Sequence, residues 1–363
     1  LLPVGISFYT FQTMSYSIDV YRKKYKPYDS FIDFASYAAF FPQLVAGPIV
    51  RADHFLNQIQ KPLTLSERNF RIAITFILYG LVKKLVFADN VAIHADAIFT
   101  EGVDLTNTAL VWWGTLCFGI QIYCDFSAYS DIAIGSALLL GIRLPENFKT
   151  PYAARSPQDF WRRWHISLST WLRDYLYISL GGSRHGQRRL YIALMATMAL
   201  GGLWHGASWN FVLWGVVHGV ILICHRLLIK LNSIKRIFES STWKTPAILF
   251  GWFVTQILVF FTWLIFRVED SALLTESIRG FLYLDSNFDL DMAIDNLPSV
   301  RYLTLILVIV FVITHGLSGH VGRLRDRLHS GNPILWGVFF AICLLSIIYL
   351  RPSESSDFIY FRF

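Results

Sequence analysis

The sequence has few charged residues and few cysteines. Only 16% of its 363 residues are charged, against about 25% in a typical soluble domain. Its four cysteines lie in apolar stretches and form no CxxC pair, which argues against a disulfide framework and a cysteine-based metal site. The soluble-enzyme signatures GxSxG, HExxH, P-loop and GxGxxG are also missing. These absences point away from a soluble enzyme, and no metal site is expected.

Hydrophobic and aromatic residues are abundant instead, at 54% and 16% of the chain. Apolar runs of about twenty residues recur along the whole length, which predicts an all-α, multi-pass membrane protein. The net charge of +7 is spread over short basic clusters between these runs. Such clusters are typical of cytoplasmic loops, so no nucleic acid partner is expected.

The chain shows no internal repeat, low-complexity segment or soluble linker, so one domain over residues 1–363 is the simplest organisation. It has no initiator methionine, and its first residue already lies in an apolar run. We therefore expect that an N-terminal portion of the full-length protein is missing.

Two early apolar segments carry unusual residues. Phe31 to Val50 contains two prolines and a glycine in its second half, which fits either a re-entrant element or a buried kinked helix. Phe70 to Ala88 can cross the membrane once, although Lys83 and Lys84 interrupt it. These lysines are expected either to extend to the membrane surface or to face the protein interior.

The next apolar run, Thr108 to Ile142, is too long for one straight crossing. Its 35 residues would make a helix of about 50 Å, against a bilayer core of about 30 Å. We therefore predict a break at Cys124 to Ser127. Asp125 at this depth indicates a polar cavity or a helix cap at the break.

Residues 143–189 form the main predicted cytoplasmic region, with nine basic and three acidic residues. Within it, Phe160 to Tyr175 alternates tryptophan with arginine. This pattern suits an amphipathic helix at the membrane surface. It equally suits a cationic mouth that attracts an anionic, phosphate-bearing donor.

His205 lies between two apolar runs, Leu190 to Leu203 and Phe211 to Ile229. A basic cluster follows, so the segment 190–229 is predicted to be a hairpin with His205 at its tip. A histidine at membrane depth is a candidate general base. The alternatives are a histidine bonded to a neighbouring carbonyl group or a pivot set by the adjacent glycines.

The remaining segments continue the alternation of inside and outside. Ala247 to Phe266 is expected to cross outward, because residues 269–295 hold seven acidic residues and one arginine. Further crossings are predicted at Tyr302 to His315 and Ile334 to Leu350, with Arg323, Arg325 and Arg327 on the inner side between them.

An ordered set of motifs covers nearly the full length: Leu2 to Tyr9, Phe41 to Pro48, Asp125 to Asp131, Glu146 to Lys149, Phe160 to Tyr177, Gly201 to Gly206 and Phe358 to Phe363. On these motifs the chain resembles the membrane-bound O-acyltransferase (MBOAT) family, in the subgroup that serves alginate O-acetylation. Relatives in this subgroup act on cellulose, peptidoglycan and teichoic acids.

This resemblance implies a fold, a reaction and two site residues. The family's catalytic histidine falls on His205, and its second signature position falls on His165. The implied fold is a ring of transmembrane and re-entrant helices around a central tunnel, with the acyl donor entering from the cytoplasm. Family members also carry about a hundred further N-terminal residues.

The resulting hypothesis is an O-acetyltransferase of the bacterial inner membrane that uses acetyl-CoA as substrate and holds no resident cofactor. The donor is expected to dock near Arg162 and Arg163. His205 is expected to act as general base, and a covalent acyl-enzyme intermediate on His205 is the alternative. His165 is expected to orient the donor or polarise the thioester. Further candidates for donor binding or oxyanion stabilisation are Trp164, Asp125, Ser127, Ser208 and Asn210.

The implied partners are membrane lipid, a separate periplasmic acetyltransferase of the SGNH type and an exported, alginate-like polysaccharide. Two other functions stay open. The chain could be a non-enzymatic scaffold or conduit subunit of a polysaccharide export complex, which would not need His205. It could also be a membrane metallohydrolase that uses its scattered histidines.

Overall fold

A computed structural model of the chain describes residues 5–62, 65–284, 287–317 and 333–359. Within these ranges the regular elements are helices, apart from one isolated bridge between Asn107 and Asn287. The predicted all-α class is therefore confirmed. The predicted inner-side arginines 323, 325 and 327, and the outer parts of the first and last motifs (residues 2–4 and 360–363), lie outside the described residues.

The α-helices are α1 (Ile6–Tyr21), α2 (Phe31–Ala38), α3 (Ala52–Ile59), α4 (Glu67–Val82), α5 (Asp89–Ile98), α6 (Thr108–Leu139), α7 (Pro157–Trp161), α8 (Ile166–Trp171), α9 (Gly186–His205), α10 (Trp209–Leu228), α11 (Asn232–Glu239), α12 (Lys244–Arg267), α13 (Ser271–Phe281), α14 (Leu290–Asp295), α15 (Arg301–Gly316) and α17 (Pro333–Leu350). Short 3₁₀ turns form η1 (Phe41–Gln43) and η3 (Pro151–Ala153), and π-helical segments form η2 (Lys83–Ala88) and η4 (Leu172–Tyr177).

Among the described residues, four helices are long and apolar enough to cross a membrane: α6, α10, α12 and α17. Helix α15 is also apolar but shorter. A bilayer core of about 30 Å needs about twenty apolar residues in a helix. The chain is therefore a multi-pass membrane protein, as predicted from its apolar runs.

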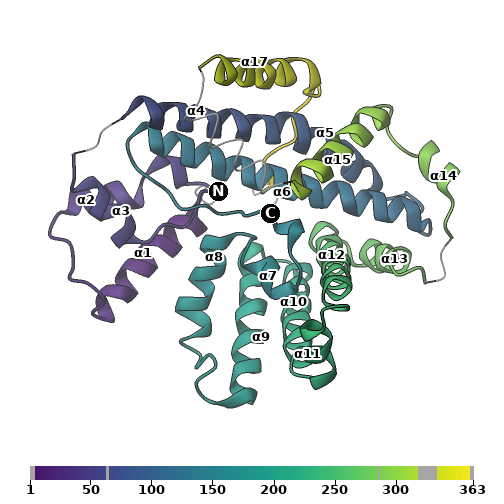
Figure 1. Cartoon of the computed structure of the whole chain (residues 1–363), viewed down its shortest axis with the longest axis horizontal. Helices are drawn as coiled ribbons and strands as arrows, with labels where there is room; N and C mark the ends of the chain where they lie inside the picture. Colours follow the sequence, from purple (N-terminus) through teal and green to yellow (C-terminus); the bar gives the residue numbers. More distant parts are fainter. Residues whose placement is uncertain (1–4, 63–64, 285–286, 318–332, 360–363) are drawn as a thin grey trace.

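Helices α4 and α6 lie side by side across the molecule, with α17 packed on the outer side of α4 (Figure 1). The α1–α3 helices lie at one end of this pair and α13–α15 at the other, while α8, α9 and α10 extend away from it. The main hydrophobic core joins these parts, because it includes buried residues of α5, α6, α10 and α12.

The predicted break in the long apolar run is wrong. Helix α6 continues without interruption for 32 residues, about 48 Å. It needs no break at Asp125 because the carboxylate is buried and lies 2.9 Å from Nζ of Lys84 on the neighbouring helical segment. The predicted helix cap at Asp125 is also wrong, since Asn107 caps α6 by accepting a hydrogen bond from the N–H of Ala109.

The two lysines that interrupt Phe70 to Ala88 face the protein interior. Lys83 lies 2.5 Å from Asp131 and donates a 2.8 Å hydrogen bond to Ser127, both on α6. Lys84 lies 2.9 Å from Asp89 and from Asp125. Both lysines begin the π-helical segment η2, which joins α4 to α5. The interior alternative is therefore correct.

The segment Phe31 to Val50 is broken where its proline and glycine residues lie. Helix α2 ends at Ala38, the 3₁₀ turn η1 follows at Phe41–Gln43, and the chain is irregular until α3. Gly47 permits this turn, because a Cβ atom there would lie 2.4 Å from Cα of Gln43. The interruption was predicted from the sequence, whereas its depth in the membrane stays a prediction.

Candidate active site

The hairpin predicted around His205 is present. Helix α9 ends at His205, and α10 starts at Trp209 and packs along it. Two glycines allow the close approach: a Cβ on Gly202 would lie 2.2 Å from the carbonyl oxygen of Phe211, and one on Gly215 would lie 2.3 Å from that of Met198. Small residues at such crossings are typical of membrane helix pairs.

Aromatic rings surround His205 at the tip of this hairpin. The imidazole centroid lies 4.9 Å from Trp204, 5.2 Å from Trp214 on α10 and 5.2 Å from Phe266 on α12. The side chain is half-buried. Most of the side chains around His205 are therefore aromatic.

A small cavity of about 10 Å³ adjoins His205. This is room for about one water molecule, and less than an acetyl thioester needs. Its walls come from α6, the end of α9, α10, α12, the turn before α8 and the C-terminal segment: Ile122, Phe126, Trp164, His205, Trp214, Trp263, Phe266 and Ile359.

The predicted amphipathic helix over Phe160 to Tyr175 is wrong, because His165 interrupts it. The residue has φ 42° and ψ 55°, in the left-handed region, and separates α7 from α8. Non-glycine residues rarely adopt this conformation and often do so at functional sites. The turn buries His165 and Trp164, with 1% and 4% of their surfaces exposed.

Asn147 holds this turn and sets the tautomer of His165. Its Oδ1 accepts hydrogen bonds from the N–H (3.1 Å) and hydroxyl (2.9 Å) of Ser167, so the amide orientation is fixed. The same oxygen lies 3.2 Å from Nδ1 of His165. Nδ1 therefore carries a proton, and the neutral ring presents a lone pair at Nε2. That Nε2 is buried and has no hydrogen-bond partner among the described residues.

The fold brings the two predicted histidines together. Trp204 lies against both rings, at 4.9 Å from His205 and 6.3 Å from His165. Phe126 also joins them, because its ring lies 4.6 Å from His165 and lines the cavity at His205. Residues 40 positions apart in the sequence thus share one aromatic cluster.

The predicted donor-binding residues divide into two groups. Trp164 lines the cavity at His205. Arg162 is exposed on the surface, and Arg163 is held by Asp159 at 2.9 Å. The two arginines therefore lie on the outer side of the turn that buries His165.

Three further candidates stabilise the walls of the cavity without lining it. Asp125 accepts a 2.6 Å hydrogen bond from the N–H of Ile359, and Ser127 accepts one from Lys83. Asn210 donates long hydrogen bonds of 3.4 Å to two carbonyl groups at the end of α12. Ser208 precedes α10 and makes no side-chain cap.

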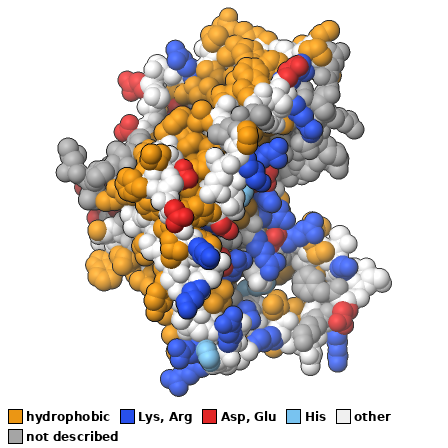
Figure 2. Space-filling model, turned by 90° about the vertical axis from the view of Figure 1, so that its left-hand side faces the viewer, with side chains coloured by type: hydrophobic (Ala, Val, Ile, Leu, Met, Phe, Trp, Pro, Cys, Tyr) orange, Lys and Arg blue, Asp and Glu red, His pale blue; other side chains and the backbone are white. Residues whose placement is uncertain are grey.

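A cluster of basic residues that the sequence did not single out lies where α1 meets η4. We define this basic cluster as Arg22, Lys24, Arg51 and Arg173. Three of its cations surround the ring of Tyr175, with Arg51 closest at 4.3 Å from the centroid. Lysine and arginine side chains also gather in a band on this side of the molecule (Figure 2).

The basic cluster is only partly neutralised. Asp174 lies 3.3 Å from Arg51 and 2.7 Å from Arg173, and Asp19 lies 2.7 Å from Lys24, so two carboxylates face four cations. Nη1 of Arg51 is buried and has no hydrogen-bond partner within the described ranges. Burial and the hydrogen bond to Asp19 raise the pKa of the Tyr175 phenol, which therefore stays neutral. The arrangement can accept an anion such as a phosphate group.

A row of aromatic rings connects the basic cluster with His205. Tyr175 lies 5.0 Å from Trp171, which stacks on Phe11 at 4.1 Å. Phe11 stacks on Trp204 at 5.3 Å, and Trp204 lies 4.9 Å from His205. The surface cations and the cavity are therefore joined by consecutive ring contacts.

No group of three or more His, Cys, Asp or Glu residues suited to a metal ion occurs in the described part of the chain. The residues that the sequence interpretation missed are Asn147, Trp204 and Arg51. Asn147 lies inside one of the quoted motifs, but the role of its side chain depends on contacts with residues that are distant in sequence. The same is true of Arg51, which meets Tyr175 only in the folded chain.

The sequence pattern of the membrane-bound O-acyltransferase family (MBOAT) matches residues 14–267. The chain is 42% identical over 341 residues to the protein named Probable alginate O-acetylase AlgI of Pseudomonas fluorescens, covering 92% of this chain and 65% of that protein. It is 32% identical over 412 residues to the Peptidoglycan O-acetyltransferase of Helicobacter pylori, covering 100% and 75%. It is 27% identical over 256 residues to the Teichoic acid D-alanyltransferase of Bacillus subtilis, covering 67% and 63%. The chain thus spans just under two thirds of the Pseudomonas relative.

Proposed function

Because the chain belongs to the membrane-bound O-acyltransferase family, we propose that it moves an acetyl group from cytoplasmic acetyl-CoA for the O-acetylation of an exported, alginate-like polysaccharide. One observation carries this assignment: His205 lies at the tip of a helical hairpin, in an aromatic cavity next to a second buried histidine. The similarity to alginate and peptidoglycan O-acetylating proteins supports the choice of an acetyl group.

In the proposed reaction, His205 accepts the proton of a hydroxyl group while that oxygen attacks the thioester carbonyl carbon. The carbon–sulfur bond then breaks, and the CoA thiolate leaves with the proton from the imidazolium. A positioned base contributes about 10²–10⁴-fold. Much of the remaining acceleration must come from hydrogen-bond donors to the oxyanion.

Trp214 is the donor that we propose for the oxyanion. Its ring lines the cavity and lies 5.2 Å from His205. Its indole N–H is buried and has no hydrogen-bond partner in the described part of the chain. Asn210 is less suited, because its NH₂ group is directed to the carbonyl groups of Ile265 and Phe266.

The tautomer of His165 determines its proposed role. A lone pair at Nε2 accepts a hydrogen bond, so polarising a carbonyl group would first require protonation of the ring. We therefore assign His165 the orientation of the donor, by accepting a hydrogen bond from an amide N–H of the pantetheine arm. Of the two roles expected for His165 from the sequence, we thus propose orientation of the donor and not polarisation of the thioester.

The basic cluster is the proposed binding site for the phosphates of acetyl-CoA, in place of Arg162 and Arg163. It offers Arg51 with an unsatisfied Nη1, whereas Arg163 is already held by Asp159. The row of rings from Tyr175 to Trp204 marks the proposed route to His205. Since the cavity holds about 10 Å³, side chains along this route must move to admit the thioester. The central tunnel of the family fold is proposed to open in this way.

The cellular setting follows from the same proposal. The chain is placed in a bacterial inner membrane as a single domain, with acetyl-CoA on the cytoplasmic side. A periplasmic acetyltransferase is proposed to receive the acetyl group and pass it to the polysaccharide. The basic cluster would then face the cytoplasm, as the predicted inside and outside loops require.

The deciding experiment supplies labelled acetyl-CoA to the cytoplasmic side of membrane vesicles that contain the protein, the candidate polymers and the partner. Wild type is compared with His205→Ala, and His185→Ala on the exposed start of α9 is the control. Label transfer by wild type and the control, but not by His205→Ala, is expected. Equal transfer by all three proteins would contradict the proposal.

A further inference from the structure

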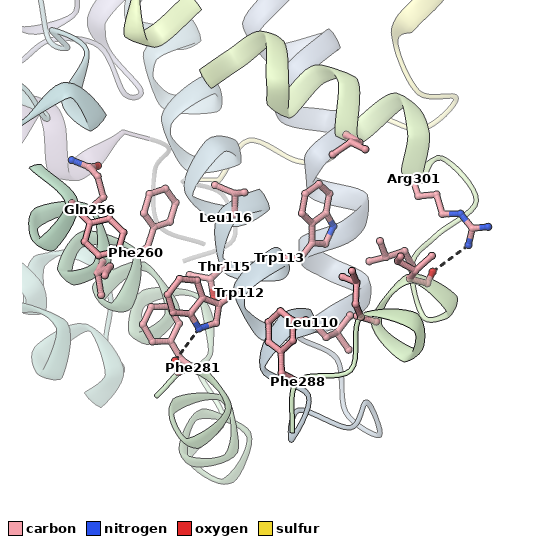
Figure 3. Close-up of a pocket in the computed structure, with 18 of the residues that line it drawn as sticks. Leu110, Trp112, Trp113, Thr115, Leu116, Gln256, Phe260, Phe281, Phe288 and Arg301 are labelled. Carbon is pink, nitrogen blue, oxygen red and sulfur yellow. Dashed lines mark hydrogen bonds between the residues drawn. The ribbon is translucent and has the colours of Figure 1, made fainter. Parts of the chain in front are cut away.

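A second, much larger cavity lies apart from the histidine site. It has a volume of about 790 Å³, within the range of about 300–1,000 Å³ that is typical of small-molecule sites. It shares no lining residue with the cavity at His205. Its walls come from α6, α12, α13, α14, α15 and the connections between them (Figure 3): Ala109, Leu110, Trp112, Trp113, Thr115, Leu116, Trp252, Phe253, Gln256, Ile257, Phe260, Phe281, Phe288, Leu290, Ala293, Ile294, Leu297, Arg301, Tyr302 and Leu305.

The walls of this pocket are mostly apolar side chains. The indole N–H groups of its three tryptophans form hydrogen bonds within the protein. The indole N–H of Trp112 donates to the carbonyl of Phe281 at 2.9 Å, and that of Trp252 donates to the carbonyl of Tyr152 at 2.9 Å. Trp113 donates to Nδ1 of His94 at 3.1 Å. These rings therefore present carbon faces to whatever occupies the pocket.

The pocket opens on an apolar surface beside helices that are suited to cross a membrane. Two of its walls, α6 and α12, are among the four helices suited to cross a membrane. Several lining side chains also reach the molecular surface, including Phe253 (53% exposed) and Leu305 (46% exposed). A pocket of this size and composition suits a hydrocarbon chain, since burying apolar surface away from water is favourable.

One cation lies at the end of the pocket. The guanidinium of Arg301 is held there by a 3.1 Å hydrogen bond to the carbonyl of Ile294 and lies 5.4 Å from the ring of Tyr302. Figure 3 shows Arg301 at the opposite end from Gln256, with the aromatic walls between them. No carboxylate lies within ion-pair distance of Arg301 among residues 5–284, 287–317 and 333–359 that the structure describes. A guanidinium in this setting suits a phosphate group.

We propose that this pocket binds one membrane phospholipid, with an acyl chain between α6 and α12 and its phosphate on Arg301. The long apolar pocket suits the acyl chain of such a molecule, and the cation Arg301 at its end suits the phosphate. The lipid would also brace the helices that build the histidine site, because α6 and α12 each line both cavities. This binding does not depend on the proposed transferase activity.

The test is native mass spectrometry of the protein released from mild detergent, with thermal unfolding measured during titration of phosphatidylglycerol. Leu305→Trp fills the mouth of the pocket, and Arg301→Gln removes the cation. Ile306→Trp and Arg279→Gln are the controls. Ile306 is exposed next to Leu305 on α15, and Arg279 is exposed on α13, but neither side chain lines the pocket.

Wild type and both controls are expected to retain about one phospholipid each and to gain thermal stability on titration. Arg301→Gln should bind about ten- to a hundredfold more weakly, as expected for a lost charge-assisted hydrogen bond, and Leu305→Trp should retain none. A wild type without bound phospholipid, or retention by Leu305→Trp equal to Ile306→Trp, would overturn the proposal. Unchanged affinity in Arg301→Gln would overturn the assignment of the phosphate.

Discussion

The backbone N–H of Ile359 donates a 2.6 Å hydrogen bond to Oδ2 of Asp125, 234 positions earlier in the chain. Ile359 forms part of the cavity at His205, whereas Asp125 does not. The carboxylate is itself fixed by Lys84 at 2.9 Å. A buried ion pair thus fixes the carboxylate that holds the backbone of a residue at the candidate active site.

Replacement of Lys84 by methionine is expected to destabilise the fold. The change leaves the buried Asp125 and Asp89 carboxylates without their shared cation, and breaking such a pair costs about 3–5 kcal/mol. Thermal unfolding in detergent measures the loss. The comparison is Glu67→Gln, which breaks the more exposed pair with Arg71 and should cost less than about 1 kcal/mol. Equal effects of the two changes would show that the buried pair adds nothing.

The change Asn147→Ala should lower acetyl transfer while leaving the protein in the membrane. Without the amide, Nδ1 of His165 and the hydroxyl of Ser167 lose a common partner. A misplacement of about 1 Å in a reacting group can cost about 10²-fold. Initial rates with labelled acetyl-CoA measure the effect, and Asn232→Ala at the exposed start of α11 serves as the control. A normal rate in Asn147→Ala would remove His165 from the proposed mechanism.

Trp214→Phe removes the indole N–H but keeps an aromatic ring at this position. Loss of one oxyanion donor typically lowers kcat by about 10²–10³-fold, and we expect a loss of this order with little change in KM. Trp336→Phe is the control, because that indole donates to the hydroxyl of Thr75 and lines neither cavity. A Trp214→Phe protein with wild-type kcat would exclude this donor.

Arg51→Gln is expected to raise the KM for acetyl-CoA by about tenfold or more, since charge-assisted hydrogen bonds contribute about 1.5–3 kcal/mol. The difference from wild type should largely persist as salt is added, because Arg51 is partly buried and such charges are screened much less than exposed ones. Arg279→Gln on α13 changes net charge equally and should leave KM unaltered. If Arg51→Gln changed only kcat, the phosphates would have to bind elsewhere.

The sequence predicted the helical class and the hairpin at His205 because both depend on local patterns. Apolar runs and the interruption at Gly201 to Trp209 are visible without knowledge of the fold. Family resemblance then added His165, which the structure places beside His205. The catalytic roles of both residues remain predictions.

The errors arose where distant residues decide local structure. The break expected at Asp125 is absent because Lys84 lies against the carboxylate. The helix expected over Phe160 to Tyr175 is interrupted at His165. There Asn147 Oδ1 accepts hydrogen bonds from Nδ1 of His165 and from the backbone N–H of Ser167. Hydrophobic periodicity contains no information about either partner.

The indoles around His205 have a practical consequence. Trp164, Trp204, Trp214 and Trp263 lie at or next to the cavity, and they are four of only 12 tryptophans in the chain. A donor that reaches the histidine must displace or shield some of them, so the intrinsic fluorescence of the unlabelled protein should report its arrival. Substrate entry can then be timed separately from chemistry, in the resting enzyme and in variants that no longer turn over.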